Sequence, residues 1–90
     1  MEQALLIDPD NGAYIDSMGW LYYQVGEYAV ALTYLERAVL LLPGDPAVYE
    51  HLGDVYFKLN DEEQAAAYWE KARQAGADEA MIQEKLEQLN

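Results

Sequence analysis

The sequence predicts an all-α protein, a helical-repeat solenoid built from antiparallel helix pairs. The chain matches itself at an offset of 34 residues, with seven identities in one window, and a fixed period of this length indicates a repeat architecture. Apolar residues recur at helical spacing throughout, and no strand pattern competes. The linkers are short, so neighbouring helices must run antiparallel. The identities pair Ala13 with Ala47, Gly19 with Gly53, Tyr22 with Tyr56, Ala31 with Ala65, Tyr34 with Tyr68, Glu36 with Glu70, and Ala38 with Ala72.

The first helix pair is predicted over residues 13–25 and 27–41. Asn11 is a suitable N-cap for the first of these helices, because its side chain can accept a hydrogen bond from the first helical turn. Gly26 ends that helix. The dipeptide at 43–44, proline followed by glycine, stops the second helix.

The second pair is predicted over residues 46–59 and 62–75, and a last helix over 79–89. Asp45 is an N-cap followed by proline at the first helical position, where its missing N–H costs nothing. Asp78 caps the last helix, which is amphipathic and polar on its outer side. A polar outer face is what a terminal element of a solenoid needs.

We therefore expect one domain over residues 1–90. Its expected parts are the tail of a preceding repeat's second helix at 1–9, a repeat at 12–45, a repeat at 46–77 and a capping helix at 78–89. Leu5, Leu6 and Ile7 would have little to pack against at the incomplete end. Either the chain is a piece of a longer array, or another chain covers these residues.

The repeated pattern is glycine, tyrosine, a turn residue, and two alanines that flank a large apolar residue. Its members are Gly19, Tyr22, Gly26, Ala31, Leu35, Ala38 and Pro43 in one copy, and Gly53, Tyr56, Asn60, Ala65, Trp69 and Ala72 in the next. The pattern resembles the tetratricopeptide repeat (TPR) family over residues 1–77. The resemblance implies a right-handed solenoid that binds a peptide or partner protein in a concave groove, without enzymatic activity.

Composition and charge exclude several classes of function. The chain has 90 residues, 52% of them hydrophobic, no cysteine and a net charge of −12. A chain this acidic repels the phosphate backbone, so we expect no nucleic-acid partner. The longest apolar run, residues 38–42, is far shorter than the about 20 residues of a membrane span. We expect a soluble protein with no targeting segment in this chain; the compartment stays open.

Catalytic and metal-binding residues are scarce. Ser17 and His51 occupy equivalent places in successive repeats, but helices 8–10 Å apart do not bring a nucleophile and a base into contact. Glu50, His51 and Asp54 supply only one imidazole for a metal ion. The sequence therefore predicts no catalytic site, no metal site and no cofactor.

The residues that the resemblance places in the groove are acidic and aromatic. They are Asp16, Trp20, Tyr23, Gln24, Glu50, Asp54, Phe57 and Lys58. Trp20 and Asp54 stand at equivalent positions, where a solvent-facing residue is expected. Acidic groups favour a basic or amphipathic peptide, with the aromatic rings giving apolar and cation–π contacts. Two alternatives stay open: the acidic groups only keep the chain soluble, or the chain self-associates through Leu5, Leu6 and Ile7 as a homo-oligomer.

Overall fold

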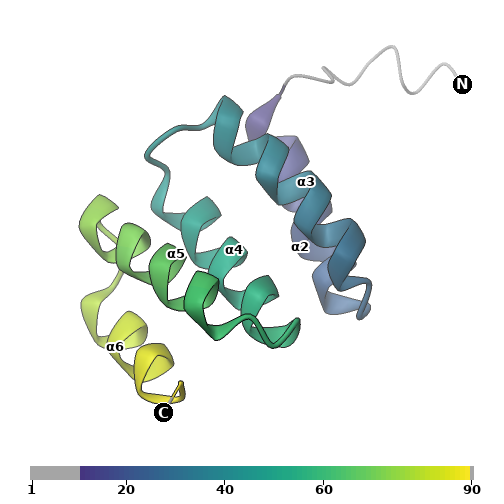
Figure 1. Ribbon diagram of the computed structural model, residues 1–90. Helices are drawn as coiled ribbons and strands as arrows, with labels where there is room; N and C mark the ends of the chain where they lie inside the picture. The colour runs from purple at the N-terminus through teal and green to yellow at the C-terminus, as the bar shows by residue number, and fades with distance from the viewer. Residues whose placement is uncertain (1–10, 90) are drawn as a thin grey trace, which may run out of the picture.

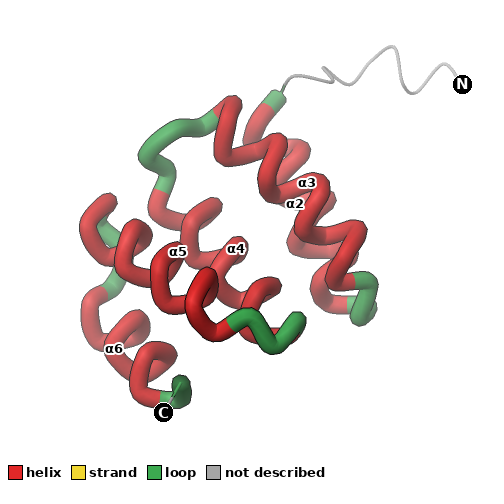
Figure 2. Tube along the Cα trace, in the orientation of Figure 1, coloured by secondary structure: helices red, strands yellow, loops and turns green. Residues whose placement is uncertain are grey.

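The computed structural model describes residues 11–89, and all regular elements in this range are helices (Figures 1 and 2). They are α2 (Gly12–Gln24), α3 (Tyr28–Leu41), α4 (Pro46–Lys58), α5 (Glu62–Ala75) and α6 (Glu79–Glu87). The predicted helix ends lie within two residues of these, and several coincide with them. The expected tail at 1–9 and the expected self-association residues Leu5, Leu6 and Ile7 lie outside the described range.

Each helix packs mainly on its neighbours in the chain. In Figure 1, α2 and α3 form one antiparallel pair, α4 and α5 form the next, and α6 lies beside α5 at the C-terminal end. A smaller contact joins α2 to α4. The all-α prediction and the sequential helix pairs are thereby confirmed.

The predicted caps are confirmed at three helix starts. The side chain of Asn11 accepts a hydrogen bond from the backbone N–H of Tyr14 at 3.0 Å. The carboxylate of Asp45 accepts from two backbone N–H groups at the start of α4, and Asp78 does the same at the start of α6. These contacts satisfy N–H groups that have no partner within the helix.

The two turns inside the helix pairs have the same left-handed backbone. Gly26, between α2 and α3, has φ = 88°, and Asn60, its equivalent between α4 and α5, has φ = 67°. Glycine and asparagine adopt this conformation at the lowest cost. The shared turn explains why both hairpins close in the same way.

The buried residues form two clusters. The first joins α2, α3 and α4 through Ile15, Ala31, Leu35, Ala38, Val48, Leu52 and Val55. The second joins α5 and α6 through Ala65, Trp69, Ala72 and Ile82, with α4 side chains packed against them.

Glycine allows close approach inside each pair. A Cβ atom on Gly19 would lie 2.7 Å from Cγ of Leu35, and one on Gly53 would overlap the Trp69 indole. The glycine of the first helix and the large side chain of the second are therefore a matched set in both repeats.

A candidate binding pocket between α2, α4, α5 and α6

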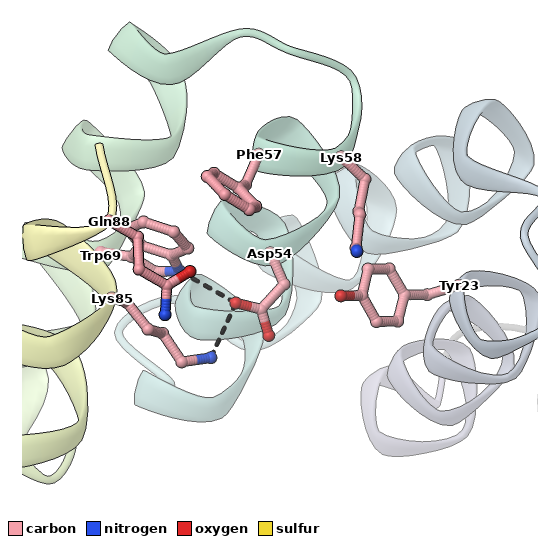
Figure 3. A pocket seen from close by; sticks show the side chains of 7 residues that line it. All are labelled: Tyr23, Asp54, Phe57, Lys58, Trp69, Lys85 and Gln88. Atoms are coloured by element: carbon pink, nitrogen blue, oxygen red, sulfur yellow. Dashed lines mark hydrogen bonds and ion pairs between the residues drawn. The ribbon is translucent and has the colours of Figure 1, made fainter. Parts of the chain in front are cut away.

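Asp54 lies at the point where α4, α5 and α6 meet. It is 8% exposed, and its oxygen Oδ1 accepts two hydrogen bonds. Nε1 of Trp69 on α5 donates one at 3.1 Å, and Nζ of Lys85 on α6 donates the other at 2.7 Å. Figure 3 shows both bonds and the second carboxylate oxygen turned away from Trp69. Asp54 thus ties α4 to the two helices that follow it.

We expected Asp54 to face solvent, and this expectation is wrong. A carboxylate leaves water only when partners replace its hydration, and Trp69 and Lys85 supply them here. Burial raises the pKa of the Asp54 carboxyl, because the charged form loses solvation, while the bonds from Lys85 and Trp69 oppose this rise. Asp54 therefore combines the roles of a core residue and a polar site residue.

Lys85 holds a second carboxylate in the same place. Its Nζ lies 3.0 Å from Oε2 of Glu50, on the turn of α4 that precedes Asp54. Burial alone would lower the pKa of Lys85, but the hydrogen bonds and charges of Asp54 and Glu50 raise it above its usual value. The single positive charge of Lys85 on α6 thus contacts two carboxylates of α4.

A pocket of about 220 Å³ opens beside this cluster. Its lining residues are Tyr23, Asp54, Phe57, Lys58, Trp69, Lys85 and Gln88. In Figure 3, Tyr23 and Lys58 lie on one side, Trp69, Lys85 and Gln88 on the other, and Phe57 and Asp54 between them. Pockets for whole small molecules usually exceed about 300 Å³. The volume here suits a single side chain.

The pocket is mainly aromatic on its apolar side. The rings of Phe57 and Trp69 lie 5.7 Å apart, centroid to centroid. Tyr23 faces them from α2, and its pKa is raised by burial and then by the negative charge of Asp54. A neutral phenol, a phenyl ring and an indole therefore line the same pocket as one buried carboxylate.

A second cluster joins α2 and α4 beside the pocket. Nδ1 of His51 lies 2.9 Å from Oδ1 of Asp16. The ring of Trp20 stacks on His51 at 4.3 Å and on Tyr23 at 4.7 Å, centroid to centroid. His51 on α4 therefore pairs with Asp16 on α2. Ser17, which follows Asp16 on α2, is exposed. The stacking contact with Trp20, one turn earlier on α2, holds the Tyr23 ring in place.

The predicted groove residues fall into three groups. Tyr23, Asp54, Phe57 and Lys58 line the pocket. Asp16, Trp20 and Glu50 belong to the adjoining clusters, and Gln24 is exposed.

Sequence reasoning did not select Trp69, Lys85 and Gln88 as pocket residues. The repeat pattern places Trp69 in helix packing, where it also belongs. For Lys85 the available signal was that the capping helix carries a single lysine within an acidic sequence.

The acidic groups expected in the groove all have partners within the chain. Asp16 contacts His51, while Glu50 and Asp54 share Lys85. The two contacts of Lys85 weaken the negative field that the sequence suggested, because an opposite charge at about 3 Å offsets much of the carboxylates' potential at a distance. The aromatic walls and the single buried carboxylate remain as the distinctive features of the pocket.

A comparison with protein-family models matches residues 22–89 to the family described as Tetratricopeptide repeat. A search of curated proteins found no match. Among the described residues, no helix is both long enough and apolar enough to cross a membrane.

Proposed function

This chain belongs to the tetratricopeptide repeat family, whose repeats form protein–protein interaction modules, and we propose that it binds an amphipathic peptide segment of a partner protein. One basic side chain of that segment enters the Asp54 pocket, and its apolar neighbours lie on the aromatic residues around it. The observation that carries this proposal is a pocket that a buried carboxylate lines together with three aromatic residues.

The carboxylate supports the basic side chain. Both hydrogen bonds that Asp54 makes within the described residues end on Oδ1. The second oxygen is left to accept from a ligand. Glu50 and Asp54 together carry one more charge than Lys85 offsets, which favours an ammonium or guanidinium group as the donor. Charge-assisted hydrogen bonds of this kind are about twice as strong as neutral ones.

The aromatic walls support the same ligand and its apolar neighbours. Tyr23 and Phe57 are half-buried and line the pocket, so their rings can contact a cation, and such a contact contributes about 0.5–2 kcal/mol depending on desolvation. Trp69 is 2% exposed, and its ring already has Nζ of Lys85 at 5.8 Å from its centroid. The methylene groups of a lysine or arginine side chain pack on the rings of Tyr23 and Phe57. The pocket thus matches both the polar end and the apolar stem of a basic residue.

Lys58 limits how basic the ligand can be. Its side chain is exposed at the edge of the pocket, and its ammonium repels a second cation placed next to the first. A segment with one basic residue among apolar ones therefore fits better than a run of lysines or arginines.

Selection from a library of random linear peptides displayed on phage tests the proposal. We expect the intact chain to enrich peptides with one lysine or arginine flanked by apolar residues. Phe57→Ala should weaken binding of a selected peptide by about 2 kcal/mol, as loss of an aromatic anchor does. Asp54→Asn should weaken binding of the same peptide, chiefly because it removes the preference for the basic residue.

The control is Lys71→Ala, which removes an exposed lysine of α5 that is absent from the pocket lining. It should leave the affinity unchanged. Enriched peptides without a basic residue, or equal binding by Phe57→Ala, would contradict the proposal. Failure to enrich any peptide would favour the alternative that the acidic groups only keep the chain soluble.

A further inference from the structure

The helices α2, α4 and α6 make equivalent polar contacts with one another. Between α2 and α4, Oδ1 of Asp16 lies 2.9 Å from Nδ1 of His51. Between α4 and α6, Oε2 of Glu50 lies 3.0 Å from Nζ of Lys85. At the offset of 34 residues, Asp16 corresponds to Glu50 and His51 corresponds to Lys85. One carboxylate of each helix thus contacts one side-chain nitrogen of the next.

Asp54 adds a second carboxylate to the later of these two contacts. Its equivalent on α2 is Trp20, whose ring stacks on His51 at 4.3 Å. Asp54 instead lies 2.7 Å from Nζ of Lys85. Within the described residues, the α4–α6 contact thus joins two carboxylates to one ammonium, while the α2–α4 contact joins one carboxylate to one imidazole. The difference is one unpaired negative charge, and it lies at the pocket.

We propose that Lys85 is the specificity-determining residue of this pocket: it offsets one of the two carboxylates and thereby limits the ligand to one basic side chain. This inference rests on the proposed function, because it concerns the segment that the Asp54 pocket binds. One ligand cation beside Asp54 completes a group of two anions and two cations. A second ligand cation exceeds the charge of Glu50 and Asp54 and is repelled by Lys85, and like charges placed together weaken association.

The position of Lys85 gives its charge a strong effect on the ligand. Its side chain is 22% exposed, lines the pocket and reaches it from the side opposite Lys58 (Figure 3). Water screens a half-buried charge less than an exposed one. Lys58 is exposed, so its repulsion of a second cation is weaker and adds to that of Lys85.

Selection from a library of random linear peptides displayed on phage compares the intact chain with Lys85→Gln. We expect the intact chain to enrich peptides with one lysine or arginine, and the variant to enrich peptides with two. Burial raises the pKa of the Asp54 carboxyl and Lys85 opposes that rise. The selection is therefore made at pH 8, to keep the carboxyl ionised when the ammonium is absent.

Calorimetric titration then measures the preference with two peptides. One is a selected peptide with a single arginine, and the other carries a second arginine next to the first. Lys85→Gln should bind the two-arginine peptide about tenfold more tightly than the one-arginine peptide, the effect of one unit charge acting over a few ångströms near the protein surface. The intact chain should show no such preference.

A second variant separates the charge of Lys85 from its structural role. Glu50→Gln combined with Lys85→Gln removes one charge of each sign, so the preference for one basic residue should return. A loosened α6 would not be repaired by the loss of a further partner. Lys71→Gln changes the net charge of the chain as Lys85→Gln does, but Lys71 is exposed and absent from the pocket lining. This control should keep the preference of the intact chain.

The outcomes distinguish this inference from the proposed function. If the intact chain enriches peptides with one basic residue and Lys85→Gln does the same, the inference is wrong while the proposed function stands. A double variant that still prefers two basic residues would also overturn the inference, because the charge count would not be the cause. If the intact chain enriches only peptides without a basic residue, or none at all, both are wrong.

Discussion

Gly53 illustrates how one residue serves both the fold and the site. Its missing Cβ lets the indole of Trp69 lie directly against α4. In that position Trp69 is 2% exposed and donates its Nε1 hydrogen to Asp54. The close approach of the two helices therefore also sets the position of the pocket carboxylate.

Gly53→Leu should destabilise the protein by about 1–3 kcal/mol or more, because a larger residue in a packed interior forces its neighbours apart. Trp69 is 2% exposed and hydrogen-bonded to Asp54, so displacing it costs its packing and that bond. Urea denaturation followed by circular dichroism measures the effect. Ala67→Leu, at an exposed position on α5, is the control and should change stability little. A Gly53→Leu variant as stable as this control would show that the close helix contact is misassigned.

At the scale of the helix, α6 depends on its contacts with α4 and α5. It has only nine residues, and isolated helices shorter than about 12–15 residues are marginal in water. Ile82 is fully buried against Trp69 and its neighbours. Lys85 adds the two ion pairs to Glu50 and Asp54. One apolar and one charged residue thus hold the last helix and complete the pocket.

Lys85→Met should destabilise the protein, because it leaves the buried Asp54 carboxylate with Trp69 as its remaining partner. The loss should be about 1–3 kcal/mol, smaller than for a fully buried pair, since Lys85 is 22% exposed. In the double variant, Asp54→Asn also removes the carboxylate charge that has lost Lys85 as its partner. The double variant should therefore lose less than the sum of the two single variants.

Denaturation of the four chains of this double-mutant cycle measures the coupling. Strict additivity would show that Lys85 and Asp54 do not interact in solution. Lys71→Met removes an exposed ammonium that lies 5.0 Å from the centroid of the Tyr68 ring, and it should cost no more than about 0.5–1 kcal/mol.

The helices were predictable because their signals are local. Asn11 and Asp45 lie next to the turns that they cap, and Gly26 and Asn60 occupy equivalent turns. Only part of the pocket lining was predictable, because the residues from α5 and α6 reach the pocket through tertiary contacts. Lys85 reaches Asp54 across 31 positions of sequence, and neither helical spacing nor the 34-residue offset pairs them.

At the scale of the whole molecule, the repeat appears in the aromatic contacts. Tyr22 stacks on Tyr34 at 5.3 Å in the first pair, and Tyr56 stacks on Tyr68 at 5.7 Å in the second. The hydroxyl of Tyr56 also donates to Glu36 on α3 at 3.1 Å. Equivalent rings therefore join the two helices of each pair, and one of them also joins the two repeats.

The tyrosines predict that stability falls at alkaline pH. Burial, and then the hydrogen bond to Glu36, raise the pKa of Tyr56 from 10.0 to about 12. Burial also raises the pKa of Tyr68. The unfolded chain therefore loses these protons first, and the free energy of unfolding decreases as pH rises above 10 toward 12. The raised pKa of Lys85 acts in the same direction at a similar pH.

Urea midpoints measured across this range, with tyrosinate absorbance as the titration signal, check the effect. Tyr56→Phe should make the decline shallower. A midpoint that stays constant while the folded tyrosines ionise would contradict the assigned environments.

Helices of successive repeats form one side-chain pocket beside Asp54. The most direct test is the fluorescence of Trp69, which lines that pocket, in a Trp20→Phe variant that leaves Trp69 as the only tryptophan. Titration with a selected peptide carrying one arginine should change the Trp69 emission saturably. The same peptide with norleucine in place of arginine should bind at least about tenfold more weakly, as loss of a charge-assisted hydrogen bond predicts. Equal affinity of the two peptides, or binding that leaves the Trp69 emission unchanged, would contradict the account.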